Sequence, residues 1–263
     1  MTQNNEILVI ENVDFSYRER KTLSDISFSV RKGEICGLLG PNGSGKTTLL
    51  KCINRILNNE TGSITIHGQN IAVLSREEIA KLIAVVPQEL TIVFSFTVLQ
   101  IVLMAGSMRF GISGVAKKND HLSALEILEE LHIVHLAQRQ YNELSGGEKQ
   151  MVLIARSLFQ KAGILLLDEP TSHLDFKRQH IIMELIRKIT REKNLTTIMT
   201  LHDPNTAGRY CDRLIMLNNG SIRHQGLRDK VFHVKYLESV YDMRIKMELT
   251  DTGAEYVLPA YEQ

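Results

Sequence analysis

The chain has 263 residues, of which 43% are hydrophobic, enough for one large globular domain or two small ones with a real core. Lys and Arg number 31 and Asp and Glu number 30, which argues against a protein that recognises nucleic acid or an anionic membrane mainly by charge. Cys36, Cys52 and Cys211 are far apart in the sequence, which argues against a disulfide framework or a zinc site and favours a reducing compartment.

The N-terminal segment predicts strands. Residues 1–6 lack the basic start and apolar run of a signal peptide, so secretion is not expected. Alternating apolar residues over 7–17 and 23–30, followed by a turn at 31–33, predict an antiparallel β layer. The short apolar run 34–39 predicts a buried strand.

A glycine-rich loop at 40–47 fits the pattern G-x-x-x-x-G-K-[S/T] at every fixed position, between a predicted strand and a predicted helix. Glycine lets backbone N–H groups approach phosphate oxygens. Lys46 would reach the β- and γ-phosphates, Thr47 would offer a hydroxyl to Mg²⁺, and the helix would point its positive end at the anion. An accidental glycine-rich turn is the alternative, but the order of strand, loop and helix favours a nucleoside triphosphate site. The predicted nucleotide-binding residues of the loop are Gly40, Asn42, Gly43, Ser44, Gly45, Lys46, Thr47 and Thr48.

An uncharged stretch over 90–108 follows a predicted strand at 62–68, a helix start at 75–78 and a strand at 83–86. At nineteen residues, it has the length of a membrane-spanning helix. Polar residues interrupt it, however, and parts of the same predicted core lie on both sides. We therefore expect 90–108 to be partly core and partly an exposed apolar patch that marks a protein interface. The interrupting residues are Thr91, Ser95, Thr97 and Gln100.

The pattern becomes helical between about 88 and 161, with periodic segments at 98–104 and 124–131 separated by a Gly-rich, basic loop at 106–118. We interpret this part as a helical insertion. A stripe of leucines recurs every three residues, and we expect it to be a helix face packed into the core. Its members are Leu122, Leu125, Leu128 and Leu131.

Another helix is predicted to begin at Ser145, which would act as N-cap while Glu148 closes a capping box. Glycine in a helix costs about 1 kcal/mol relative to alanine, so capping alone does not account for both Gly146 and Gly147. The close approach of an anion to the backbone would account for both glycines. The predicted buried stripe of this helix comprises Met151, Ile154, Ala155, Leu158 and Phe159.

Continuous apolar runs at 163–168 and 195–201, linked by a predicted helix at 179–191, indicate parallel strands buried on both faces. Asp168 ends the first run and Glu169 follows, at the strand end where ligands gather in such sheets. Asp168 suits Mg²⁺, and Glu169 suits the role of general base toward an attacking water. The C-terminal part predicts a helix over 231–241 and a hairpin over 245–258 around residues 251–253, with no assignable chemistry.

Together these motifs resemble those of ATP-binding-cassette (ABC) ATPases. The resemblance rests, in chain order, on the loop at 40–47, Gln88 after a strand, Leu144 to Glu148, the strand 165–169, Ser172 to Asp175, and His202. It implies that Tyr17 stacks on the adenine of ATP, that Gln88 senses Mg²⁺ and the γ-phosphate, and that His202 contacts the γ-phosphate. It also implies that Ser145, Gly146 and Gly147 cap ATP bound to the other subunit of a head-to-tail dimer.

The fold implied is α/β: a P-loop NTPase core of mostly parallel sheet, with an antiparallel β layer and an inserted α-helical subdomain. We expect the first part of the ATPase core at 1–88, the helical subdomain with the signature motif at 89–161, the second part of the core at 162–225 and a short C-terminal extension at 226–263.

Within the ABC family the chain is most similar to ATPase subunits of importers for iron-siderophore, haem, cobalamin or molybdate-type substrates. The similarity lies at 97–104 and 171–176 and in the short tail, whereas Ala105-Gly106 replaces the Gly-Arg common in those subunits. It implies ATP-driven closure and reopening of a dimer and a permease that contacts the region Gln88–Met108. It also implies an extracytoplasmic substrate-binding protein as an indirect partner, no nucleic acid, and a cytoplasmic place on the inner face of the cell membrane.

Three alternatives stay open. The chain could serve an exporter, because import rests on resemblance alone. A cassette protein that remodels ribosomes or DNA resembles paired cassettes or cassettes split by coiled coils, whereas this sequence has one cassette and no sustained heptads. A GTP-hydrolysing switch would need an Asn-Lys-x-Asp motif, which the sequence lacks.

Overall fold

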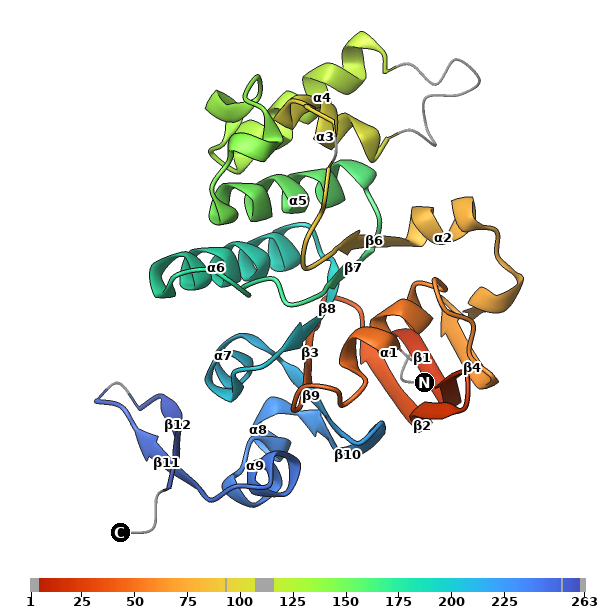
Figure 1. Cartoon of the computed structure of the whole chain (residues 1–263), viewed down its shortest axis with the longest axis vertical. Coiled ribbons are helices and arrows are strands. Elements are labelled where there is room, and N and C mark those ends of the chain that lie inside the picture. The colour runs from red at the N-terminus through yellow and green to blue at the C-terminus, as the bar shows by residue number, and fades with distance from the viewer. Residues whose placement is uncertain (1–4, 93, 107–115, 252, 261–263) are drawn as a thin grey trace. The chain divides into compact units, whose positions relative to one another are not determined.

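The computed structural model describes residues 5–92, 94–106, 116–251 and 253–260, which divide into two compact units (Figure 1). The first unit combines 1–74 with 187–263, and the second comprises 75–186. Helix α6 (Phe176–Glu192) begins in the second unit and ends in the first.

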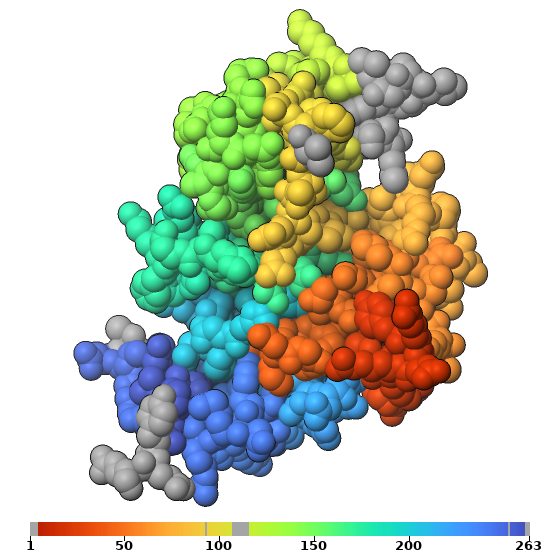
Figure 2. Space-filling view, in the orientation of Figure 1, coloured from red at the N-terminus to blue at the C-terminus, as the bar shows by residue number. Residues whose placement is uncertain are grey.

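An antiparallel sheet forms one part of the first unit, with strand order β2-β1-β4-β5. Its red and orange atoms gather in one part of the surface in Figure 2. The sheet confirms the predicted antiparallel layer. Leu8, Ile10 and Val13 are buried, Val9 is half-buried, and Glu11 and Asn12 are exposed. The strands are β1 (Glu6–Tyr17), β2 (Arg20–Arg31), β4 (Thr61–Ile66) and β5 (Gln69–Asn70).

A second sheet of the first unit has the order β10-β9-β3-β8. Strand β3 runs parallel to both β8 and β9, and β10 pairs antiparallel with β9. Every residue of β3 and β8 is buried, as their continuous apolar runs predict. These strands are β3 (Ile35–Leu39), β8 (Thr196–Leu201), β9 (Arg213–Asn218) and β10 (Ser221–Leu227).

Helices and a hairpin complete the described part of the first unit. The hairpin pairs β11 antiparallel with β12 and confirms the hairpin predicted at the C-terminal end, although Thr252 of its turn lies outside the described residues. Cys36, Cys52 and Cys211 are buried free thiols, and burial raises the pKa of each. The elements are α1 (Lys46–Ile53), α7 (Pro204–Tyr210), α8 (Arg228–Val231), α9 (Val234–Tyr241), β11 (Ile245–Leu249) and β12 (Glu255–Pro259).

The second unit holds two parallel strands and a group of helices. Strands β6 and β7 pair in parallel register from Ile83 opposite Ile164 to Val86 opposite Leu167. Helices α3, α4 and α5 contact one another, which confirms the predicted helical segment. The elements are β6 (Ile83–Val86), β7 (Ile164–Leu167), α2 (Arg76–Leu82), α3 (Val98–Met104), α4 (Lys118–Glu130) and α5 (Gly146–Gln160).

The expected leucine stripe of α4 is only partly buried. Leu128 and Leu131 are buried and Leu125 is half-buried, but Leu122 is 50% exposed. The prediction was wrong for Leu122 because a helix turns about 100° per residue, so residues spaced by three drift by about 60° at each step. In α5 the stripe is broader than predicted, since Val152 and Leu153 join it and Met151 is only half-buried.

The uncharged stretch 90–108 is divided as expected between core and surface. Val98, Ile101 and Val102 of α3 are buried, whereas Phe94 is 71% exposed and Met104 is 40% exposed. Within the described part of the chain, no helix is long and apolar enough to cross a membrane. Val93, Ser107, Met108 and most of the predicted loop 106–118 lie outside the described residues.

Candidate nucleotide-binding and catalytic site

The glycine-rich loop joins β3 to α1 in the first unit, so the predicted order of strand, loop and helix is present. Lys46 is the first residue of α1 and only 5% exposed. Its Nζ donates hydrogen bonds to the carbonyl oxygen of Gly40 at 2.7 Å and to that of Pro41 at 3.0 Å. The loop therefore fixes a positive charge beside its own backbone.

Two positions of the loop require glycine for different structural reasons. Gly40 has φ +154°, and a Cβ there would lie 2.1 Å from the carbonyl oxygen of Leu217 in β9. Gly43 has φ +77°, and a Cβ there would meet no heavy atom within 4 Å. Packing against β9 thus requires glycine at 40, whereas Gly43 needs glycine for its backbone conformation and has open space beside it.

Ser44 supplies a further sign that the loop is built for a polar ligand. Its side chain is 2% exposed, and within the described part of the chain its Oγ is buried with no hydrogen-bond partner. Such a group costs free energy unless a ligand or water satisfies it. Of the other predicted loop residues, Asn42 is exposed, Thr47 is half-buried, and Gly45 and Thr48 are buried.

In the second unit, the parallel strands β6 and β7 bring three predicted residues together. Asp168 and Glu169 follow β7 directly, and the backbone N–H of Asp168 donates to the carbonyl of Val86 at 2.9 Å. Gln88 lies two residues beyond β6, and its Nε2 donates to Oε2 of Glu169 at 3.0 Å. Ligands gather at this carboxyl end of parallel strands.

The backbone of Glu169 adopts the left-handed conformation, with φ +50°. For an L-residue with a side chain, this conformation costs on the order of 1 kcal/mol. The turn that follows holds it in place, because the backbone N–H and the Oγ of Ser172 both donate to the carbonyl oxygen of Glu169, at 3.1 and 2.9 Å. The side chain of Glu169 is thereby aimed by its own turn as well as by Gln88.

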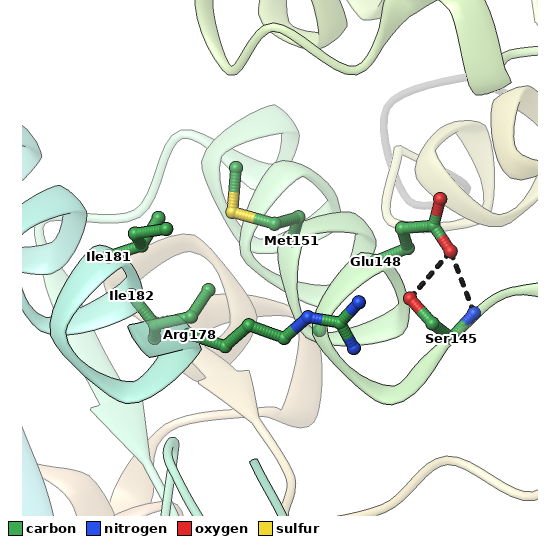
Figure 3. Close-up of a pocket in the computed structure, with 7 residues that line it drawn as sticks. Ser145, Glu148, Met151, Arg178, Ile181 and Ile182 are labelled. Carbon is green, nitrogen blue, oxygen red and sulfur yellow. Dashed lines mark hydrogen bonds between the residues drawn. The ribbon is translucent and has the colours of Figure 1, made fainter. Parts of the chain in front are cut away.

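Ser145 is the N-cap of α5, as predicted. The Glu148 carboxylate accepts hydrogen bonds from Oγ of Ser145 at 2.6 Å and from its backbone N–H at 2.7 Å (Figure 3). These two bonds lower the pKa of Glu148 below its usual value. These hydrogen bonds therefore close the first turn of the helix.

Gly147 has a neighbour that the sequence did not indicate. Arg178 of α6 reaches toward the first turn of α5 (Figure 3), and a Cβ on Gly147 would lie 2.9 Å from its Cδ. A Cβ on Gly146 would meet only Leu174 at an ordinary 3.6 Å. The only sequence signal for Arg178 is Asp175 three residues earlier, with which it forms an ion pair at 3.4 Å.

Two pockets lie beside these residues in the second unit. The first measures about 190 Å³ and is lined by Ser145, Gly147, Glu148, Met151, Arg178, Ile181 and Ile182. The second measures about 330 Å³ and brings Gln88 together with Gly146 and the segment 172–174. Motifs far apart in the sequence thus share one cavity. Its remaining lining residues are Glu89, Leu90, Thr91, Tyr141, Lys149, Gln150 and Leu153.

The other predicted residues belong to the first unit. Tyr17 ends β1, is 44% exposed, and stands edge-on to the ring of Phe15 with centroids 4.8 Å apart. His202 is exposed and follows β8 directly. The predicted metal ligands are divided, because Thr47 belongs to the first unit while Gln88 and Asp168 belong to the second. No cluster of three His, Cys, Asp or Glu side chains suited to a metal occurs among the described residues.

Three features together define a P-loop ATPase. They are the mixed α/β fold, the phosphate loop between a buried strand and a helix, and a strand-end glutamate held by a glutamine. Residues 23–172, more than half of the chain, match the family model described as ABC transporter. The chain therefore belongs to the ATP-binding domains of ABC transporters, which bind and hydrolyse ATP.

Similar proteins include transport ATPases. The chain is 38% identical to an iron chelatin transport ATP-binding protein of Helicobacter pylori, over 90% of this chain and 93% of that protein. It is also 38% identical to a hemin import ATP-binding protein of Shewanella denitrificans, over 89% of this chain and 93% of that protein. Among solved structures, a metal-chelate type ABC transporter in an inward-facing conformation matches with TM-score 0.87 and 29% identity, covering 98% of this chain and 99% of that chain.

Proposed function

We propose that this chain powers the uptake of a metal-chelate type substrate (iron-siderophore, haem, cobalamin or molybdate) through a membrane permease. The importer names of its relatives and the metal-chelate type structure support this choice of substrate class. The observation that carries the catalytic part is Glu169, which is fixed at the end of β7 by its turn and by the 3.0 Å hydrogen bond from Gln88.

ATP would bind with its phosphates on the loop of the first unit. Lys46 would exchange the carbonyl groups of Gly40 and Pro41 for phosphate oxygens, and the buried Oγ of Ser44 would gain a partner. Tyr17, which is 44% exposed, would offer its ring to adenine. The proposed contacts of the loop are Gly40, Asn42, Gly43, Ser44, Gly45, Lys46, Thr47 and Thr48.

The residues proposed for Mg²⁺ are Thr47, Asp168 and Gln88, which offer the oxygen ligands that this ion takes alongside phosphate oxygens. When bound, Mg²⁺ neutralises charge on the β- and γ-phosphates. Glu169 would accept a proton from the attacking water, and His202 would contact the γ-phosphate. Because the turn at Ser172 and the amide of Gln88 both hold Glu169, its carboxylate needs little reorganisation during the reaction.

Each site would be completed by a second copy of this chain, whose Ser145, Gly146 and Gly147 would cap the ATP in a head-to-tail dimer. The permease would contact the region Gln88–Met108, and this is supported by the 330 Å³ pocket at Gln88–Thr91 and by the exposed Phe94. The protein would then lie on the cytoplasmic face of the cell membrane, with a substrate-binding protein on the other side. We also propose the domain division given above, with the first part of the ATPase core at 1–88, the helical subdomain at 89–161, the second part of the core at 162–225 and the C-terminal extension at 226–263.

The test is uptake in cells that carry the gene of the full chain or its Glu169→Gln variant. We expect uptake of one labelled metal chelate to be lost with the variant and the tagged chain to co-purify with a membrane permease. A matched conservative change away from the site, Glu192→Gln, is the control. Loss of efflux instead would show an exporter, and association with ribosomes and no membrane protein would refute transport.

A further inference from the structure

The described residues of the C-terminal extension, 226–251 and 253–260, pack against β9, β10 and α7 of the first unit. Helix α9 contacts β9 and β10, and β12 contacts α7. In Figure 2 the dark blue atoms of the extension continue the surface formed by the paler blue atoms of β9 and β10. The sequence indicates no chemistry for this segment, but the segment forms hydrogen bonds with residues 202–205, which follow β8.

Tyr241, the last residue of α9, makes the most direct of these hydrogen bonds. Its hydroxyl donates to the backbone carbonyl of His202 at 3.1 Å. One side-chain oxygen therefore ties α9 to the residue proposed to contact the γ-phosphate.

The hydroxyl of Tyr241 is well suited to this place. Burial raises its pKa, and the nearby carboxylate of Asp203 raises that pKa further. The hydroxyl therefore keeps its proton at neutral pH and can donate it to the carbonyl of His202. Phenylalanine would fill the same space without that bond.

Two more contacts hold the same region. Asn205, in the first turn of α7, exchanges two hydrogen bonds with Val257 of β12: its Nδ2 donates to the carbonyl at 3.0 Å, and its Oδ1 accepts from the N–H at 2.7 Å. Asn218 Nδ2 donates to the carbonyl of Val240 at 2.9 Å, which ties the end of α9 to β9. The segment 202–205 is thus attached to the extension at both of its ends.

We propose that Tyr241 is a positioning residue for ATP hydrolysis, which holds the backbone of His202 in place through its hydroxyl. This rests on the proposed role of His202 at the γ-phosphate. The extension then holds the segment 202–205 in position. Without the hydroxyl, the segment 202–205 loses its hydrogen bond to α9, and the histidine samples positions that do not reach the phosphate.

The test compares Tyr241→Phe with Tyr256→Phe in the purified full chain. Tyr256 is the matched control, because it lies on β12 of the same extension and is 46% exposed. We expect Tyr241→Phe to lower kcat about three- to tenfold, as the loss of one hydrogen bond allows, with the affinity for ATP changed less than about twofold. Tyr256→Phe should leave both unchanged.

A second measurement separates positioning from general loosening. In protein without nucleotide, hydrogen exchange of the peptide that contains residues 200–206 should quicken in Tyr241→Phe and not in Tyr256→Phe. In a His202→Ala background, Tyr241→Phe should have no further effect on kcat, because it acts through the histidine.

Each outcome decides a different point. Wild-type turnover of Tyr241→Phe, or an equal loss of turnover in the His202→Ala background, overturns the role of Tyr241 alone. Unchanged exchange at 200–206 also overturns it, since no positioning would then have been lost. Wild-type turnover of His202→Ala overturns the role proposed for His202 and that of Tyr241 with it, while the transport proposal still stands on Glu169.

Discussion

Replacement of Gly147 by alanine should change the stability of the fold little and the rate of ATP hydrolysis strongly, so the variant distinguishes the two roles of this glycine. Alanine in the first turn of α5 gains about 1 kcal/mol of helix propensity. Its Cβ would lie 2.9 Å from Cδ of Arg178, which must move to another rotamer at a cost of about 0.5–1.5 kcal/mol. The two terms nearly cancel, since the Arg178 side chain is flexible and 48% exposed. We therefore expect the free energy of unfolding to change by less than about 1 kcal/mol.

Hydrolysis should suffer far more. If Gly147 approaches the ATP of the partner copy, the methyl group prevents close contact, and turnover should fall at least about tenfold, which corresponds to about 1.4 kcal/mol. The assay is ATP hydrolysis at rising protein concentration, beside thermal unfolding of the same samples. Gly163→Ala is the control, because a Cβ at Gly163 meets no heavy atom within 4 Å.

The double variant Gly147→Ala/Arg178→Ala gives the decisive result. Removal of the arginine side chain leaves room for the methyl group, so any defect that came from crowding Arg178 would disappear. We expect the hydrolysis defect to persist. Wild-type turnover of the single variant, or full recovery in the double variant, would refute the idea that Gly147 faces a nucleotide and would leave Arg178 as the whole reason for this glycine.

Three further predictions concern the loop, the base and an ion pair. Glu169→Gln should lower turnover by roughly 10² to 10⁴ while ATP binding is kept, and near-wild-type hydrolysis would disprove the role of Glu169 as base. Gly40→Ala should cost more than about 3 kcal/mol in a urea titration, because its Cβ would lie 2.1 Å from the Leu217 carbonyl; an unchanged midpoint would contradict this packing. Burial opposes the charge of Glu34, but the hydrogen bonds from Arg213 and from the Arg31 backbone N–H, both at 3.0 Å, and the charges of the two arginines together outweigh it and lower the pKa of Glu34 below its ordinary value of 4.5. Glu34→Gln should therefore cost about 1–3 kcal/mol at pH 7, with the difference lost as pH falls below about 4.5; a difference that persisted in acid would have another origin.

Local patterns predicted the parts of the fold that neighbouring residues determine. The loop between β3 and α1, the cap at Ser145 and the buried runs of β7 and β8 each depend on residues close in the sequence. The leucine spacing failed at Leu122 because equal spacing by three residues was treated as one helix face, although the helix period is about 3.6.

Contacts between distant segments could not be predicted in the same way. Gln88 and Glu169 are 81 residues apart, and their hydrogen bond depends on β6 and β7 pairing in parallel. The bond from Tyr241 to the His202 carbonyl spans 39 residues, and its acceptor is backbone, which no sequence pattern reveals. The neighbour of Gly147 was missed for a similar reason, since Arg178 approaches from another helix.

The left-handed backbone of Glu169 has a consequence for anyone who engineers this protein for heat resistance. Glycine or asparagine tolerates φ +50° better than glutamate does, so replacing Glu169 by either should relieve on the order of 1 kcal/mol of strain. A screen that scores only the survival of folded protein would therefore select the loss of the proposed base. Selection for thermostability should couple each round to ATP turnover, because at this position the more stable chain is expected to be the inactive one.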